Sequence, residues 1–187
     1  AGDESLPLEA RRGIPPVLAG IGGEQAQRIL YDNLLVSDVV LRYRVIDALA
    51  RLQRQRPGSH VDRQAVEMVL AAEIVGHYRS YQILGTISDA LAADQTMTDG
   101  LEQSIQQERE RIFGLLGLLT GTTDIQDAYD ALGDESATVR ANALELLDNV
   151  LSPDLRRLVV PLVDPLVSFG ERVTLANRLV GAAIENS

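Results

Sequence analysis

The sequence predicts an all-α fold of about eight or nine helices. Leu, Ala, Val and Ile dominate its apolar residues, aromatic residues make up only 4%, and Trp is absent. Sandwiches and barrels usually recruit more β-branched and aromatic side chains than this. Along most of the chain the apolar residues also recur every three or four positions, which is the period of an amphipathic helix.

A second observation is that one amphipathic sequence pattern occurs more than once in the chain. The pattern of residues 39–57 returns at 137–153, where Arg140 aligns with Arg42 and Leu147 aligns with Leu49. Residues 11–21 align with 42–52 at an offset of 31, and shorter helical segments at 24–35 and 124–132 precede the two fuller copies. A helix, a tight turn and a helix that recur every 30-odd residues are typical of an α-solenoid, whose units bury their apolar faces by stacking.

The repeated pattern resembles HEAT repeats, with Leu41-Arg42 and Val139-Arg140 as the matching pairs and Ala10-Arg11 as a weaker copy. Residues 109–151, together with 41–52, are similar to HEAT regions beside the transmembrane part of bacterial ATP/ADP-translocase-like transporters. The resemblance implies an armadillo-like α-α superhelix that acts as a scaffold. It also implies that each repeat arginine pairs with an aspartate of its inter-helix turn, namely Arg42 with Asp38 and Arg140 with Asp134. Transport activity is not implied, because the matching residues contain no transporter segment.

We expect residues 1–187 to form one HEAT-like domain. Residues 1–56 would hold the first repeats, 61–119 a longer irregular helix pair, and 120–187 the last repeats and a C-terminal cap. Because the chain begins with Ala rather than Met, we also expect it to be a fragment of a longer protein. Within the irregular pair we expect a helix at 61–93, a turn at 94–100 and a helix at 101–119. The expected buried stripe of the first helix is Val66, Val69, Leu70, Ile74, Tyr78, Tyr81 and Leu84.

The chain ends carry further helix signals. Residues 8–22 are expected to be helical, with a kink or a new helix at Pro15 and Pro16, and Ser152 is expected to cap a helix that starts at Pro153. Near the N-terminus, two sets of apolar residues are predicted to point inward: Leu8, Ile14, Val17, Leu18 and Ile21, and then Ile29, Leu30, Leu34 and Leu35.

The last helix is predicted to have one polar side, as a capping repeat requires. The residues of that side are Glu171, Arg172, Asn177, Arg178 and Glu185.

Neither catalysis nor a cofactor is predicted. The chain has no cysteine and only two histidines, and no nucleophile elbow or phosphate loop is present. Glu73 and His77 are spaced i, i+4 and could touch a metal together, but His60 is the only other histidine, so an ion pair or a packed histidine is the favoured interpretation. The close carboxylate pairs are interpreted as solvated: Asp127 with Asp130, Asp134 with Glu135, and Glu108 with Glu110.

One segment is strongly basic in a protein whose net charge is −10. Between residues 42 and 63 there are six arginines and only two acidic residues, Asp47 and Asp62. The segment could meet anionic lipid headgroups, a nucleotide or an acidic partner, or it could neutralise acidic helices of its own fold, which is the favoured interpretation. The candidate binding residues are Arg44, Arg51, Arg54, Arg56 and Arg63.

These observations predict a non-catalytic scaffold or protein-interaction module of a bacterial protein. Its expected partner is another protein, and its place is the cytoplasm, with or without a tether to the membrane through a parent chain. The alternative is a regulatory sensor domain that binds an anionic ligand or nucleotide through the 42–63 arginines. General nucleic-acid binding is not expected at this net charge, no apolar run is long enough to span a bilayer, and the oligomeric state stays open.

Overall fold

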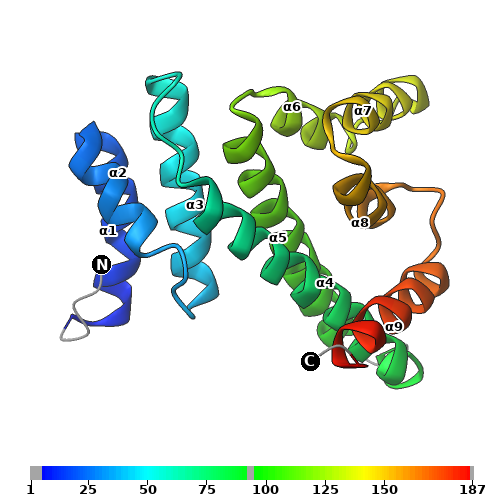
Figure 1. Ribbon diagram of the computed structural model, residues 1–187. Coiled ribbons are helices and arrows are strands. Elements are labelled where there is room, and N and C mark those ends of the chain that lie inside the picture. Colours follow the sequence, from blue (N-terminus) through cyan, green and yellow to red (C-terminus); the bar gives the residue numbers. More distant parts are fainter. Residues whose placement is uncertain (1–5, 92–94, 186–187) are drawn as a thin grey trace. The chain divides into compact units, whose positions relative to one another are not determined.

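The computed structural model describes residues 6–91 and 95–185, and every regular element within them is an α-helix (Figure 1). This confirms the all-α prediction for the described part of the chain. The helices are α1 (Leu8–Ile21), α2 (Gly23–Asp32), α3 (Val39–Gln55), α4 (Arg63–Leu91), α5 (Gln95–Thr120), α6 (Asp124–Ala131), α7 (Ala137–Val150), α8 (Pro153–Val163) and α9 (Phe169–Glu185).

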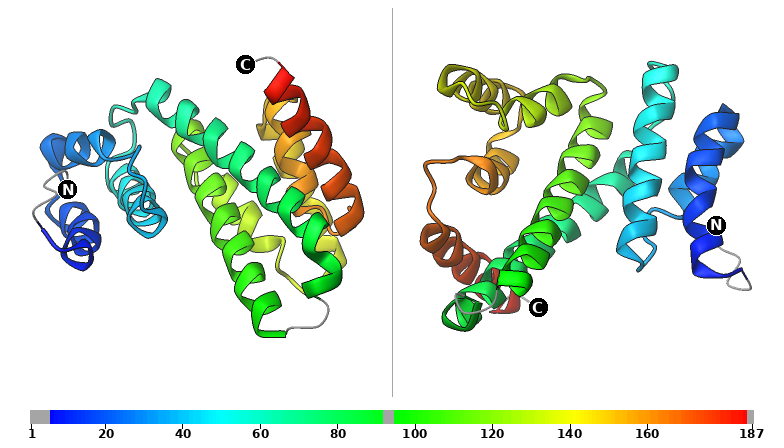
Figure 2. Two further views of the ribbon diagram at one scale, coloured as in Figure 1. Left: turned by 90° about the horizontal axis from the view of Figure 1, so that it is seen from below. Right: turned by 180° about the vertical axis from the view of Figure 1, so that it is seen from behind.

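The chain divides into two compact units. Unit 1 comprises Ala1–Leu70 and Phe113–Thr123, and unit 2 comprises Ala71–Ile112 and Asp124–Ser187. The long helices α4 and α5 contribute residues to both units, whereas α1 to α3 belong to unit 1 and α6 to α9 belong to unit 2. Figure 2 gives two further views of these helices. That the whole chain forms one repeat domain stays a prediction.

In unit 1, α3 is the central helix. It begins where the Asp38 side chain accepts a hydrogen bond from the Leu41 amide, at 2.8 Å, which satisfies one of the free N–H groups of the first turn. Both α1 and α2 pack against α3. On another side, Ile46 lies against α5 at Gly114, where an added Cβ would stand 2.7 Å from Ile46 Cγ2. The fully buried aliphatic residues of α3 are Leu41, Val45, Ile46, Ala48, Leu49 and Leu52.

The outer side of α1 departs from the prediction. The helix continues through Pro15 and Pro16 without ending, and Pro15 and Ala19 are its buried residues. Val17 and Ile21, which were expected to point inward, are 60% and 73% exposed. The physical reason is that α2 and α3 pack against the opposite face of α1, which carries Pro15 and Ala19. Leu8, at the start of α1, and Leu35, after α2, are also exposed, against expectation.

The stripe predicted for α4 is confirmed, because all seven of its residues are buried. In unit 2, the Tyr78 hydroxyl donates a hydrogen bond to the Leu158 carbonyl of α8 at 2.7 Å. On the same helix, Gly85 lets α9 approach closely, since a Cβ there would lie 2.5 Å from Val173 Cγ1. The helix predicted at 101–119 begins earlier, at Gln95, so residues 95–100 of the expected turn are helical and Asp94 lies outside the described residues.

The predicted C-terminal signals are largely confirmed. Ser152 caps α8 by accepting from the Leu155 amide, and Pro153 is the first helical residue. On α9 the side chains of Glu171, Asn177 and Arg178 are exposed, as a polar outer side requires. Arg172 differs, because its guanidinium is half-buried and folds back onto the main chain. The side chain of Glu185 lies outside the described residues.

Candidate functional site

The candidate basic segment is bound largely by its own fold. Arg44 Nη1 donates to the Arg12 carbonyl at 2.8 Å, and Arg51 forms an ion pair with Asp47, one turn away on α3, at 2.9 Å. Arg63 pairs with Glu67 at 3.2 Å and donates to the Leu119 carbonyl of α5 at 3.2 Å. These contacts are made to residues of unit 1, so three of the five candidates have partners within their own fold, while the binding role of the segment stays a prediction.

Arg54 and Arg56 behave differently from the other arginines of the segment. They lie at the end of α3 and at its C-cap, and both are exposed. Within the described part of the chain neither guanidinium makes a hydrogen bond or an ion pair. Their positive charges therefore face solvent, where they also complement the negative end of the α3 dipole.

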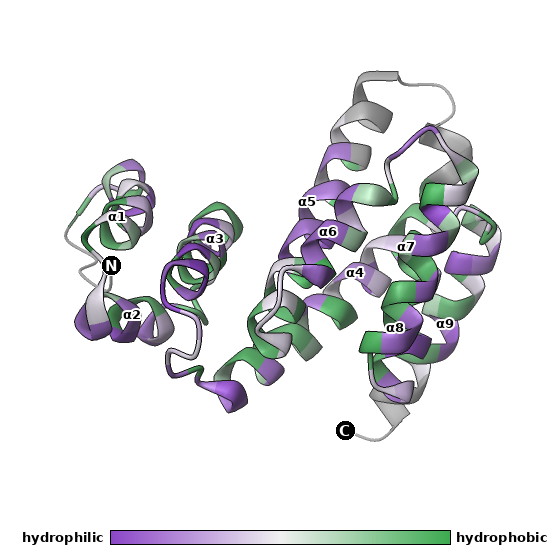
Figure 3. Cartoon of the chain, turned by 90° about the horizontal axis from the view of Figure 1, so that it is seen from above, coloured by the Kyte–Doolittle hydropathy of each residue, from purple (hydrophilic) through white to green (hydrophobic). Residues whose placement is uncertain are grey.

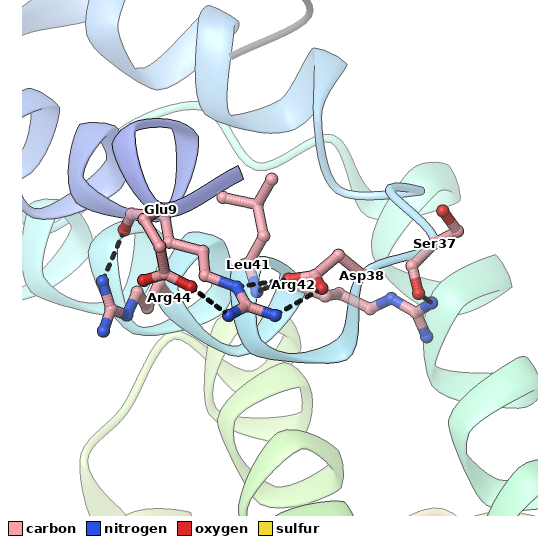
Figure 4. Close-up of polar contacts among 7 residues, drawn as sticks. Glu9, Ser37, Asp38, Leu41, Arg42 and Arg44 are labelled. Carbon is pink, nitrogen blue, oxygen red and sulfur yellow. Dashed lines mark hydrogen bonds and ion pairs between the residues drawn. The ribbon is translucent and has the colours of Figure 1, made fainter. Parts of the chain in front are cut away.

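Sequence reasoning missed a two-point contact between an arginine and an aspartate in unit 1. Arg12 of α1 binds Asp38 with two nitrogens: Nε donates to Oδ1 at 3.1 Å and Nη2 donates to Oδ2 at 2.7 Å. Its third nitrogen, Nη1, pairs with Glu9 at 2.7 Å. Figure 4 shows Glu9 and Asp38 with the arginines around them. The Arg12 hydrogen bonds hold the pKa of Asp38 below its ordinary value, and the Asp38 hydrogen bond raises the pKa of Arg12.

The two repeat arginines hold turns through main-chain atoms. Arg42 donates from Nε to the Val36 carbonyl at 2.9 Å and from Nη2 to the Ser37 carbonyl at 3.4 Å. Arg140 Nη1 donates to the Asp134 and Glu135 carbonyls at 2.7 and 2.8 Å. In both cases the acceptors lie six and five residues before the arginine, so the two turns are closed in the same way.

The partner atoms therefore differ from the expectation of arginine–carboxylate pairs. The Asp38 carboxylate is bound by Arg12 and by the Leu41 amide. The Asp134 carboxylate accepts from the Ser136 amide at 2.7 Å, while Arg140 donates to the main-chain carbonyl of Asp134. Every residue has a main-chain carbonyl, so residue types alone could not reveal which carbonyl accepts from each arginine.

Two further arginines of unit 2 also donate to main-chain carbonyls, but at other spacings. Arg156 donates to the Asp148 carbonyl at 3.4 Å, and Arg172 donates to the Pro161 and Asp164 carbonyls at 2.9 and 2.8 Å. Each of these arginines stands four residues after a serine that caps its helix through the side-chain oxygen. The caps Ser136, Ser152 and Ser168 are 16 residues apart, as are Arg140, Arg156 and Arg172. This regular spacing is a sequence signal that could have found the pattern.

Glu73 and His77 of α4 each bind a different residue of α5. Glu73 Oε2 accepts from Arg111 Nε at 2.9 Å, and both side chains are buried. His77 is fully buried, with Nδ1 2.8 Å from Glu108 Oε2 and its ring nearly perpendicular to the ring of Tyr81. The Ser80 hydroxyl donates to the other Glu108 oxygen at 2.8 Å. The structure thus has the packed histidine that the sequence favoured, whereas Glu73 pairs with Arg111 and not with His77.

The polar cluster is enclosed between α4 and α5. His77 Nε2 is buried, and none of the described residues gives it a hydrogen-bond partner. Among the described residues, no group of three or more His, Cys, Asp or Glu side chains is arranged to hold a metal ion. The cluster instead fixes the position of α5 against α4 within unit 2.

The predicted carboxylate pairs lie on the surface or serve the fold. Asp127, Asp130, Asp134 and Glu135 are exposed, as expected of a solvated face. Glu110 is half-buried and accepts a hydrogen bond from Gln106, whereas its predicted partner Glu108 binds His77 and Ser80. None of these pairs is enclosed in a way that would separate the roles of an acid and a base.

Charge is distributed unevenly between the two units. Unit 1 contains nine arginines and nine acidic residues, whereas unit 2 contains eight arginines and eighteen acidic residues. The whole net charge of −10 therefore belongs to unit 2. Three of the arginines of unit 2 bind main-chain carbonyls, as described above, so they do not neutralise the exposed carboxylates of that unit, such as Asp127 and Asp130.

Comparison with family models, curated proteins and solved structures finds no match for the chain. Among the described residues, no helix combines the length and the apolar character needed to cross a bilayer.

Proposed function

We propose that the chain is a non-catalytic protein-interaction scaffold built from HEAT-like helix pairs. The observation that carries the proposal is the shared closure of the turns before α3 and α7. In each, the arginine four residues after the cap donates to the carbonyls six and five residues before it. A repeated way of holding two helices at a turn is what a stack of similar units requires.

The contacts of the polar side chains also support a structural role rather than a catalytic one. The buried polar residues Glu73, His77 and Arg111 bind within the α4–α5 pair. The repeat arginines are occupied by main-chain carbonyls. What unit 2 offers to its surroundings is an acidic helical surface, on which Asn142, Glu145 and Asn149 of α7 are exposed. Such a surface is suited to binding another protein. Cytoplasmic placement and attachment to a membrane protein belong to this proposal and rest on the resemblance to transporter-associated HEAT regions.

The proposal is tested by affinity capture from a bacterial lysate, membranes included. The wild-type chain is compared with variants that carry substitutions at exposed positions of α7. Asn142→Arg and Asn149→Arg, made singly, should each reduce the capture of a specific partner several-fold. The matched control is Gln25→Arg on α2, which replaces an exposed amide by the same charge and should leave capture unchanged. Failure of the wild-type chain to capture any specific protein would overturn the scaffold proposal. Capture that all three variants retain would exclude α7 as the binding surface.

A second function is supported only at Arg54 and Arg56. Their exposed guanidinium groups, which have no partner among residues 6–91 and 95–185, could hold an anionic ligand, which would make the chain a sensor domain. A thermal-shift panel of nucleotides and inorganic phosphate tests this, because a ligand at 100 times its Kd stabilises the folded state by about 2.7 kcal/mol. Stabilisation of the wild type that is lost in an Arg54→Gln, Arg56→Gln double variant would favour the sensor. An unchanged melting temperature with every probe would exclude these ligands at the concentrations used.

A further inference from the structure

The hairpin of α6 and α7, residues 124–150, concentrates the negative charge of unit 2. It contains seven acidic residues and one arginine, which gives it a net charge of −6. All seven acidic side chains are exposed, whereas Arg140 is half-buried and its Nη1 binds two main-chain carbonyls. The acidic residues are Asp124, Asp127, Asp130, Asp134, Glu135, Glu145 and Asp148. The hairpin therefore presents carboxylates that its own arginine does not neutralise.

Several acidic residues of unit 1 are instead held in ion pairs by arginines. Arg12 binds Glu9 and Asp38, and Arg51 binds Asp47. Within the part of the chain that the structure describes, none of the seven hairpin carboxylates forms an ion pair. They do not converge on one point either, since no group of three or more possible ligands among the described residues is placed to hold a metal ion. The hairpin thus has an extended field of negative charge and not a site for a single cation.

Two aliphatic side chains lie on one side of α7 within this acidic surface. Val139 and Leu146 are 37% and 36% exposed, and they stand seven positions apart, which is close to two helical turns. Exposed Asn142 lies between them and exposed Glu145 lies beside them, whereas Arg140 projects from another side of the helix. Figure 3 shows hydrophobic segments in green between hydrophilic segments in purple along α7. The exposed side of α7 therefore combines aliphatic and acidic groups.

The sign of the charge decides which class of macromolecule can cover this surface. Nucleic acids and anionic membranes are repelled by exposed carboxylates that no cation offsets. A symmetric contact between two copies of the hairpin would bring together two charges of −6 and is disfavoured for the same reason. A basic protein segment is attracted. If that segment is an amphipathic helix, its apolar stripe can also cover Val139 and Leu146.

We propose that the surface of α6 and α7 binds a basic amphipathic helix of a partner protein. The inference rests on the proposed scaffold function and names the class of partner that α7 receives. The hairpin carboxylates attract the arginine and lysine side chains of the partner, and the apolar stripe of the partner covers the aliphatic residues of α7. Because salt screens the attraction between exposed charges, binding weakens as the ionic strength rises.

The probe is a fluorescent synthetic peptide with leucines at i, i+3, i+4 and i+7, arginines at the flanking positions and alanine elsewhere. It is titrated with the full chain, and binding is followed by fluorescence anisotropy. One control peptide has the same composition in scrambled order, and a second has glutamate in place of every arginine. We expect saturable binding of the patterned basic peptide only, with an affinity that falls about tenfold or more between about 0.05 M and about 0.5 M NaCl.

A pair of double variants separates the hairpin from the rest of the chain. Glu135→Gln, Glu145→Gln removes two exposed charges of the hairpin and should weaken binding of the patterned peptide about fivefold or more. The matched control is Glu24→Gln, Asp32→Asn, which removes the same charge from exposed positions of unit 1 and should bind as the wild type does. Circular dichroism and melting temperature confirm that both variants stay folded.

The inference is overturned if the wild type does not bind the patterned basic peptide, or if the scrambled or the acidic peptide binds equally well. Equal weakening in the two double variants would overturn it as well. The synthetic peptide binds whether or not a lysate contains the natural partner, so this result is independent of the capture test. Specific capture from the lysate together with failed peptide binding would retain the scaffold and reject a basic helix as its partner.

Discussion

Arg12 binds both carboxylate oxygens of Asp38, which lies 26 residues further along the chain. The pair joins α1 to the cap of α3, because Asp38 also accepts from the Leu41 amide at the start of that helix. One carboxylate thus serves a helix cap and a contact between two helices at once. Its charge matters for the second role, whereas a neutral acceptor is sufficient for the first.

We expect Asp38→Asn to destabilise the protein at neutral pH but not in acid. The Arg12 hydrogen bonds hold the folded-state pKa of Asp38 below its ordinary value of 3.8. The stabilisation is therefore complete above the unfolded-state pKa and disappears as the pH falls through the folded-state pKa. Urea unfolding of the wild type and the variant between pH 7 and pH 2.5 should show two free energies of unfolding that converge in acid. A difference that stays constant over this range would show that the ion pair contributes nothing.

Arg140→Met should lower the free energy of unfolding by about 1–2 kcal/mol. The substitution keeps an unbranched side chain but removes the two hydrogen bonds to the Asp134 and Glu135 carbonyls. The matched control is Arg157→Met on α8, an exposed arginine that makes no hydrogen bond or ion pair within the described residues, and its effect should stay within about 0.5 kcal/mol. Chemical denaturation measures both, and equal effects would contradict the role assigned to the repeat arginines.

The buried Glu73–Arg111 pair should show strong coupling. Glu73→Leu leaves the Arg111 guanidinium, 6% exposed, without its carboxylate, and breaking a buried pair in this way costs about 3–5 kcal/mol. Adding Arg111→Met should recover most of the loss, because replacing both members by apolar groups is often neutral or stabilising. A double-variant cycle of unfolding free energies checks this. Additive losses would mean that the two charges act independently.

Gly114→Ala should be destabilising although alanine favours helices. The added Cβ would stand 2.7 Å from Ile46 Cγ2, so α3 and α5 would have to separate within unit 1, at a cost of about 1–3 kcal/mol. Gly76→Ala on α4 is the control, because nothing lies within 4 Å of its Cβ position. That change should stabilise the protein by about 0.5–1 kcal/mol. Melting temperatures that move in the same direction for both would be inconsistent with the close packing at Gly114.

Some features could be predicted from the sequence because they depend on local periodicity. The buried stripe of α4 from Val66 to Leu84 and the Ser152–Pro153 helix start are of this kind. The Arg12–Asp38 contact is not, because the choice of partner depends on how two helices pack. The repeat alignment also assigned Val17 and Ile21 the same environment as Ala48 and Leu52. It could not show that, in the described part of the chain, Val17 and Ile21 are exposed while Ala48 and Leu52 are buried.

The orientation of α7 gives the last prediction. Leu147 is fully buried and Glu145, two positions earlier, is exposed, as the sequence pattern indicates. Leu147→Asp would bury an unpaired charge, which costs several kcal/mol and should abolish the cooperative unfolding of the helices around α7. Glu145→Ala should change the free energy of unfolding by less than about 0.5 kcal/mol. Circular dichroism during thermal unfolding separates the two cases, and similar effects would mean that α7 packs through a different face.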